Sequence, residues 1–237
     1  MTESDGEPRR VAYCLLGQDG RIIVAQDSLE PFYAASTIKL AVMATAARAV
    51  DAGELAWDVP IEAQGPTVRE LVADMIELSS NEATNVLARR LGFASITEVL
   101  SDADAEGCRM ERLIGDRAAT DAGLTNEVTP AGLARLLWSI VTGRLSSPAS
   151  RELMVEQLRR QQFPVIADVL APGTPWGSKS GWVDWIDHDA AFVGSPSDRF
   201  LVLAVCTAGF PGREGLAEIR RVAASVLPPE VLKRVRA

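Results

Sequence analysis

The sequence predicts an α+β fold, because strand patterns lie near both ends of the chain and helix patterns fill most of residues 36–165 between them. Strands supplied by both ends would form one antiparallel sheet, which leaves the helices as an inserted lobe. With 237 residues and 47% hydrophobic content, the chain is long enough to bury a large core, as one domain or as two intertwined subdomains.

The first elements are a hairpin and a buried helix. Residues 11–16 and 21–26 have β-rich compositions, and the turn 17–20 between them contains two glycines, which predicts a hairpin. Residues 37–50 are apolar nearly all round, which is typical of a buried helix, and Asp51-Ala52-Gly53 would end it.

The middle of the chain reads as helical and the last third returns to strands. Thr67 and Glu70 have the spacing of a capping box at the start of a helix that runs to about Glu77. Further helix patterns cover residues 81–91, 95–101, 130–142 and 147–161. Strand patterns follow at residues 177–182, 190–194 and 200–206, before an amphipathic helix over residues 214–226.

The composition argues against several classes of function. The formal net charge is -8, and no cluster of Lys and Arg is long enough to follow a nucleic-acid backbone. Cys14, Cys108 and Cys206 are widely spaced and His188 is the only histidine, so neither a disulfide framework nor a metal site is indicated. We expect buried free thiols, no cofactor and no nucleic-acid partner.

The N-terminus carries no visible export signal. Its first ten residues are polar, and the apolar stretch 11–16 is too short for the core of a signal peptide. Nothing approaches the roughly 20 apolar residues that span a bilayer. The sequence therefore predicts no membrane partner and a cytoplasmic location, with an acidic composition common among bacterial enzymes.

Ser36 and Lys39, at the start of the first predicted helix, are candidates for nucleophilic chemistry. A serine hydroxyl becomes a useful nucleophile when a nearby base removes its proton. The chain contains 21 Arg and only 3 Lys, and a buried lysine can lose its proton whereas arginine cannot. The alternative is that Lys39 is an ordinary solvated lysine on a helix surface.

Two further motifs follow in order, Ser79-Ser80-Asn81 and Lys179-Ser180-Gly181. Taken alone, the first is more often a polar junction between helices, and the second is weaker still. With the Ser-x-x-Lys pair, they resemble the serine β-lactamase and penicillin-binding superfamily, specifically its class A β-lactamase branch. The similarity covers roughly residues 10–228 and includes the flanking stretches 50–53, 67–71, 78–85 and 128–130.

The resemblance implies a β-lactamase/transpeptidase-like fold, with an antiparallel five-stranded sheet, flanking helices and an inserted all-helical subdomain. Residues 1–33 and 166–237 would form the sheet subdomain, residues 34–165 the helical subdomain, and the active site would lie between them.

The resemblance also implies catalytic roles. Ser36 would be acylated, Lys39 would take its proton, and Ser79, held by Lys39 and Lys179, would relay a proton to the leaving group. The backbone N–H groups of Ser36 and Trp182 would form an oxyanion hole.

Other motif residues would bind the substrate. Asn81 would hold a side-chain amide of the substrate, while Lys179 and Ser180, followed by Gly181, would bind its carboxylate. Asn85 would support the site from behind.

His188 and the tryptophans near Lys179 leave alternatives open. His188 falls near the place where relatives keep a cation for the substrate carboxylate and would serve when protonated, or it is simply hydrogen-bonded to Asp187 or Asp189. Trp176, Trp182 and Trp185 would form an aromatic rim around the cleft, or pack within the fold.

One loop departs from the family pattern. Class A β-lactamases carry a Glu-x-x-Leu-Asn loop whose glutamate activates the water that releases the acyl-enzyme. Residues 112–126 lack that sequence, and an ungapped count puts Arg117 in the place of the glutamate. Asp116, Asp121 or Glu127 would substitute only if the loop folds differently. Ser80 also replaces the aspartate of the second motif.

Together these features predict a β-lactamase-like serine hydrolase that forms an acyl-enzyme on Ser36 with amide, lactam or ester substrates bearing a carboxylate. Without the loop glutamate, β-lactam turnover would be weak. The alternatives are a cytoplasmic peptidase, esterase or acyltransferase that acts on a small metabolite, and a catalytically silent binding module that retains the cleft. The sequence leaves the natural substrate and the oligomeric state open.

Overall fold

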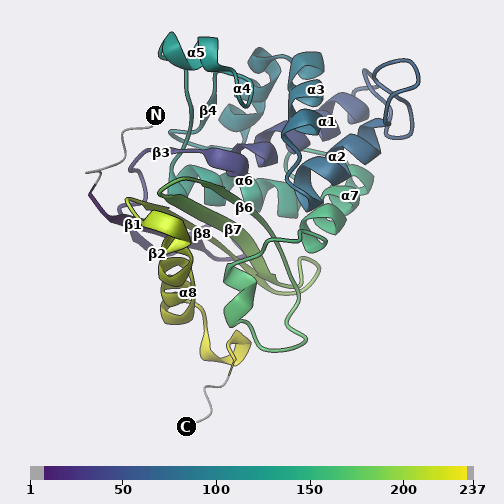
Figure 1. Cartoon of the computed structure of the whole chain (residues 1–237). Helices are drawn as coiled ribbons and strands as arrows, with labels where there is room; N and C mark the ends of the chain where they lie inside the picture. The colour runs from purple at the N-terminus through teal and green to yellow at the C-terminus, as the bar shows by residue number, and fades with distance from the viewer. Residues whose placement is uncertain (1–7, 234–237) are drawn as a thin grey trace.

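The larger sheet is built from both ends of the chain, as the sequence predicts. The computed structural model describes residues 8–233. Five antiparallel strands lie in the order β2-β1-β8-β7-β6, so the first strand pairs with the last (Figure 1). The strands are β1 (Arg10–Leu16), β2 (Ile22–Gln26), β6 (Trp176–Val183), β7 (Ile186–Gly194) and β8 (Phe200–Ala208).

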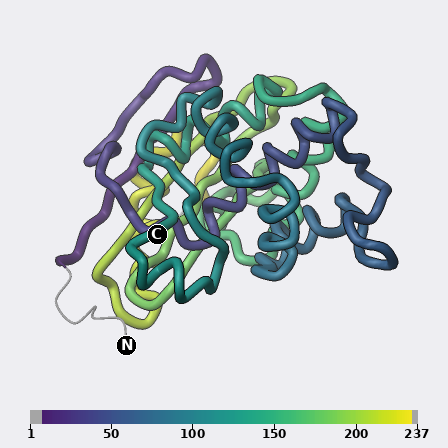
Figure 2. Tube along the Cα trace, turned by 90° about the horizontal axis from the view of Figure 1, so that it is seen from above, coloured from purple at the N-terminus to yellow at the C-terminus, as the bar shows by residue number. Residues whose placement is uncertain are grey.

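The chain between β2 and β6 is mainly helical. Its helices are α1 (Lys39–Asp51), α2 (Val68–Glu77), α3 (Asn81–Leu91), α4 (Phe93–Asp102), α5 (Arg117–Asp121), α6 (Pro130–Thr142) and α7 (Pro148–Arg159). Viewed from above, α2 and the loop before it lie on the opposite side of the molecule from β1 and β2 (Figure 2). This segment also contains a small sheet of β3 (Phe32–Tyr33), β5 (Asn126–Val128) and β4 (Arg109–Met110), which the sequence analysis did not anticipate.

The large sheet is covered on both faces, because its side chains alternate between two hydrophobic clusters. In β8, Val202 and Ala204 join α6 on one face, whereas Leu203 and Val205 join the C-terminal helix α8 (Gly215–Val226) on the other. The long apolar strand patterns therefore come from burial on both sides.

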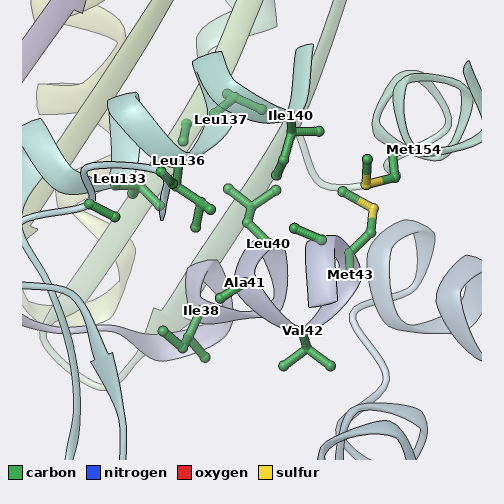
Figure 3. Packing of buried hydrophobic residues seen from close by; sticks show 14 of the residues in the cluster. Ile38, Leu40, Ala41, Val42, Met43, Leu133, Leu136, Leu137, Ile140 and Met154 are labelled. Carbon is green, nitrogen blue, oxygen red and sulfur yellow. The ribbon is translucent and has the colours of Figure 1, made fainter. Parts of the chain in front are cut away.

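Helix α1 lies in the middle of the molecule, as its all-round apolar sequence predicts. Leu40 points toward Leu136 of α6, and Met43 points toward Met154 of α7 (Figure 3). This packing fixes the N-terminal end of α1, where Lys39 is the first residue.

Local signals account for several helix starts. Thr67 accepts a hydrogen bond from the N–H of Glu70, and the Glu70 carboxylate accepts one from the N–H of Thr67, which confirms the predicted capping box. The Thr129 side chain likewise caps the N-terminus of α6, and Pro130 follows it as the first residue of that helix. Within residues 8–233, no helix combines the length and apolar character needed to cross a membrane.

Candidate active site

Ser36 lies on a short 3-10 turn, η1 (Ala35–Ile38), directly before α1. The Thr37 hydroxyl donates to the carbonyl oxygen of Ala34 at 2.6 Å, which ties the turn to the preceding backbone. Ala35 has a φ of +45°, a left-handed conformation that is costly for a residue with a Cβ. Ser36 is only partly buried although its neighbours are covered, so the turn presents its hydroxyl at the edge of the core.

Lys39 joins the first motif to the second. Its side chain is fully buried, and its Nζ donates to the carbonyl oxygen of Ser79 at 2.6 Å, to the Ser79 hydroxyl at 3.2 Å and to Oδ1 of Asn81 at 2.8 Å. Ser79 has a φ of +59°, so its backbone turns sharply just before α3. The interpretation of Lys39 as a solvated surface lysine is therefore wrong.

Lys179 brings the third motif to the same hydroxyl. Its Nζ donates to the Ser79 hydroxyl at 3.1 Å and to the carbonyl oxygen of Ser180 at 2.8 Å. The Ser79 oxygen is thus shared by two buried lysines, one from α1 and one from β6. Segments that are 40 and 100 residues from Ser79 in the sequence meet at this one atom.

Burial weakens the proton affinity of both lysines. Desolvation lowers the pKa of Lys39 to about 7. Desolvation, with a further contribution from the nearby charge of Lys39, lowers the pKa of Lys179 to about 7. Near neutral pH a substantial fraction of this pair is therefore uncharged and able to accept a proton.

Gly181 lets strand β6 approach the turn that carries Ser36 closely. A Cβ on this glycine would lie 2.6 Å from the backbone nitrogen of Ser36 and 2.8 Å from that of Thr37. No side chain fits in that space. The backbone of β6 therefore runs against the N–H side of Ser36, which is the side where an oxyanion hole would form.

Ser180 faces away from this contact. Its hydroxyl accepts a hydrogen bond from Nε2 of Gln161 at 3.0 Å, and the residue is 1% exposed. Beneath it, Asp189 accepts hydrogen bonds from the N–H groups of Val165 and Ile166, both at 2.8 Å. Ser180 thus lies against α7 and the loop after it in this arrangement.

His188 does not join the lysines and serines. It is 1% exposed, its Nε2 lies 2.9 Å from the carbonyl oxygen of Tyr33, and its Nδ1 lies 2.7 Å from the carbonyl oxygen of Asp187 and 3.2 Å from the backbone nitrogen of Thr207. Burial lowers its pKa to about 4, so the ring is neutral at physiological pH. Of the two roles that the sequence left open, the contact with Asp187 describes this histidine, and it is made by the backbone carbonyl oxygen of Asp187.

Arg213 is a cation that the sequence did not indicate, and it lies beside Asp187 and Trp182. Arg213, in the connection between β8 and α8, donates from Nε to the buried carboxylate of Asp187 at 2.6 Å and stacks on the ring of Trp182, with its Cζ 4.6 Å from the ring centroid. Its sequence position gave no signal, because it is one of 21 arginines and lies outside every motif. Only the fold brings Arg213 beside Trp182, which follows Gly181 in the third motif's strand.

The three tryptophans near Lys179 lie in two different surroundings. Trp182 and Trp185 line a surface hollow of about 430 Å³ together with Arg213, and Phe163 packs edge-on against Trp182 at 5.4 Å between ring centroids. Trp176 instead packs against the hydrophobic cluster under α8.

The loop of residues 112–126 is held at Ile114. Nδ2 of Asn85 donates to the carbonyl oxygen of Ile114, and Oδ1 of Asn85 accepts from its N–H, both at 2.9 Å. Asn85 lies one helical turn after Asn81 on the same face of α3, so Ile114 lies one turn away from the group that holds Lys39. Arg117 is the exposed first residue of α5.

The three carboxylates considered as replacements are engaged elsewhere or exposed. Asp116 caps α5 by accepting from the N–H of Ala119 at 3.0 Å. Glu127 pairs with Arg109 at 2.9 Å. Asp121, at the end of α5, is exposed. In the described part of the chain, no recorded contact connects any of them to Ser36, Lys39 or Ser79.

Comparison with known proteins identifies the family of this chain. A model described as the β-lactamase enzyme family matches residues 3–228, nearly the whole chain. The chain belongs to this family.

Solved structures of similar proteins superpose on this chain over most of their length. A β-lactamase from Sphaerobacter thermophilus DSM 20745 is 27% identical, with 95% of each chain covered and a TM-score of 0.79. An ancestral class A β-lactamase, GNCA, is 25% identical, with 92% of this chain and 94% of that chain covered and a TM-score of 0.79. The structure of PBP-A, 24% identical with 93% and 89% covered and a TM-score of 0.78, shares the fold. The predicted superfamily and α+β fold class are thus confirmed, and family membership supports serine hydrolase-like activity in general terms.

Proposed function

We propose that this protein is a serine hydrolase that forms an acyl-enzyme on Ser36. The observation that carries the proposal is the Ser79 hydroxyl, which accepts hydrogen bonds from both Lys39 and Lys179. A neutral Lys39 takes the proton of the Ser36 hydroxyl as its oxygen attacks the substrate carbonyl. The N–H of Ser36 and a second N–H from β6, at Trp182, stabilise the oxyanion. The tetrahedral intermediate then collapses, and the proton passes through Ser79 to the leaving amine or alkoxide.

The proposed substrates are amides, lactams or esters that carry a carboxylate. Lys179 provides one cation beside Ser79. We assign the second to Arg213 in place of His188, because its two terminal nitrogens have no recorded partner in the described part of the chain, whereas its Nε is anchored on Asp187. The anchored guanidinium is therefore oriented without being fully satisfied, which suits a bidentate carboxylate contact. Asn81 remains the candidate for the substrate amide.

Slow release of the acyl group is part of the proposal. A well-placed general base typically contributes about 10²–10⁴ in rate, and the loop residue that Asn85 of α3 holds by two hydrogen bonds is Ile114, whose side chain is not a base. The acyl-enzyme would therefore form from a β-lactam faster than water releases it. This favours, as a second candidate, a peptidase, esterase or acyltransferase that works on a small metabolite whose release does not need a carboxylate from this loop.

The test is intact-mass spectrometry after incubation with a penicillin and with a fluorophosphonate. We expect one adduct per chain in the wild type, stable over minutes for the penicillin, and none in Ser36→Ala. If correctly folded wild-type protein gives no adduct with any acylating probe, the hydrolase proposal is wrong and a silent binding module is left. Turnover of a chromogenic cephalosporin at rates typical of enzymes, about 1–10³ s⁻¹, would refute slow release.

A further inference from the structure

The loop after α7 connects two sides of the candidate active site. The N–H of Gln162 donates to the carbonyl oxygen of Glu77, the last residue of α2, at 3.1 Å. Nε2 of Gln161 donates to the hydroxyl of Ser180, on β6, at 3.0 Å. We call residues 161–163 the strap, since they join the segment that leads into the second motif to the strand that carries the third.

The strap covers one row of side chains on β6. Ser180 and Trp182 lie two residues apart in the strand, so their side chains point to the same face. Gln161 contacts the first, and Phe163 packs edge-on against the second with 5.4 Å between the ring centroids. Arg213 stacks on the same Trp182 ring. The row therefore leads from the third motif to the cation that we assign to the substrate carboxylate.

Gln161 makes the Ser180 hydroxyl inaccessible. The two residues are 3% and 1% exposed. Oε1 of Gln161 accepts from the N–H of Phe163 at 2.6 Å, which holds the amide in place. The resemblance described above assigns the Ser180 hydroxyl to the substrate carboxylate, but here a side chain of the protein itself covers it. A carboxylate can accept a hydrogen bond from this hydroxyl only when the Gln161 side chain moves away.

We infer that Gln161 selects between substrates by competing with their carboxylate for the Ser180 hydroxyl. This inference rests on the proposed acylation of Ser36 and names the residue that sets its substrate preference. The Gln161 amide bonds only neutral groups, whereas a carboxylate that accepts from Ser180 makes a charge-assisted bond, which is roughly twice as strong. A carboxylate therefore displaces Gln161 at a cost, and an uncharged ester reacts while the strap stays closed.

The strap has few bonds to break. In the described part of the chain, two recorded hydrogen bonds connect it to other segments, from Gln161 to Ser180 and from the Gln162 backbone to α2. Phe163 is 42% exposed. Directly after the strap, the Asp189 carboxylate fixes the backbone by accepting from two successive N–H groups. Opening is thus confined to a short segment beside the third motif.

Two substitutions of Gln161 test the inference, and they are expected to act in opposite directions. The readout is the rate of acylation by a penicillin divided by the rate of labelling by an uncharged fluorophosphonate. Gln161→Ala frees Ser180, so we expect this ratio to rise about 3- to 10-fold, as for the loss of one neutral hydrogen bond. Gln161→Glu keeps the shape but puts a negative charge on Ser180, so we expect the ratio to fall about tenfold.

The matched controls are the same two changes at the next residue. Gln162 is exposed and holds the strap through its backbone, so Gln162→Ala and Gln162→Glu should leave the ratio unchanged. A double-mutant cycle then shows whether the effect passes through Ser180. In the Ser180→Ala background, adding Gln161→Ala should give no further rise.

Three results would overturn the inference. These are equal effects at Gln161 and Gln162, a ratio that moves in the same direction for Gln161→Ala and Gln161→Glu, or a rise that persists in the Ser180→Ala background. Titration calorimetry of the penicillin with Ser36→Ala, with and without Gln161→Ala, should show the same gain as tighter binding, and no acylation is needed for it. A wild type that gives no fluorophosphonate adduct would count against the acyl-enzyme alone.

Discussion

Two lysines buried around one serine hydroxyl define the chemistry at the level of single residues. Lys39 and Lys179 both contact the Ser79 oxygen, so the charge on either one raises the cost of charging the other. Such a pair titrates as a unit, with apparent pKa values that belong to both groups. Lysine at these two positions fits the proposed proton transfer, because arginine would stay charged there.

The first prediction concerns the pH dependence of acylation. Since the pKa of Lys39 is lowered to about 7, the lysine is protonated and unable to act as a base below pH 7, and neutral above it. We expect the rate of penicillin adduct formation to rise with pH through about 7 and then level off.

The control for that experiment is a charge-retaining substitution. Lys39→Arg should reduce acylation by about 10²–10⁴ at all pH values below 10, because the guanidinium stays protonated. Lys233→Arg, at an exposed lysine far along the chain, should behave like the wild type. A rate that is flat between pH 5.5 and 8.5 in the wild type would argue against Lys39 as the base.

Arg213 provides the second prediction. If it binds the substrate carboxylate, Arg213→Ala should raise the KM for a carboxylate-bearing substrate about 10- to 100-fold, corresponding to the loss of a charged hydrogen bond. The KM for an uncharged ester should change little. Both constants can be measured by steady-state or acylation kinetics, with Arg199→Ala as the exposed control. Equal losses for the charged and uncharged substrates would indicate that Arg213 acts only by supporting Trp182.

At the level of elements, the loop of residues 112–126 is the part of the fold that we propose to control release of the acyl group. Asn85 fixes Ile114 by two hydrogen bonds, and this contact is independent of the Ile114 side chain. We therefore expect Ile114→Glu to fold and to place a carboxylate near Lys39, which should speed deacylation by at least tenfold. The decay of the adduct can be measured by mass spectrometry at successive times after acylation has been stopped.

The matched control for this variant is Ile114→Gln, because a glutamine side chain has the shape of glutamate but cannot act as a base. It should leave the decay rate unchanged. If Glu and Gln at this position give the same decay rate, then the loop does not bring residue 114 to the acyl ester.

The sequence predicted elements whose signals are local and missed those fixed by tertiary contacts. The helix pattern over residues 130–142 matches α6 because Thr129 and Pro130 mark its start. The strand pattern at residues 190–194 found only part of β7 (Ile186–Gly194), since Asp187, His188 and Asp189 read as polar although all three are buried and hydrogen-bonded.

The same distinction holds within the candidate site. Spacing and resemblance suggested Ser36, Lys39, Ser79 and Lys179, and the structure brings the three motifs together. The position of Arg213 depends on the connection after β8, which no sequence pattern marks. The position of Ile114 depends on hydrogen bonds from the Asn85 side chain of α3. An ungapped count pointed to Arg117 and missed Ile114, because such a count does not show which loop residue Asn85 holds.

At the scale of the whole molecule, one hydrophobic cluster connects the two proposed subdomains. It contains Leu136 and Ile140 of α6 together with Ala190, Phe192 and Val202 of the sheet. Both parts therefore lose a large buried surface if either one unfolds alone, and that cost favours a single cooperative transition. The division into residues 1–33 with 166–237 and residues 34–165 would then describe the path of the chain and not two units of independent stability.

Urea denaturation tests this coupling, because the tryptophans report on both parts. Trp57 and Trp138 lie in the helical part, and Trp176, Trp182 and Trp185 lie on or beside the sheet. We expect the same midpoint from tryptophan fluorescence, from far-UV circular dichroism and from a Trp57→Phe, Trp138→Phe variant whose fluorescence comes from the sheet part alone. Separate midpoints would mean that the helical part unfolds on its own, and Lys39 would then leave Lys179 before the sheet is lost.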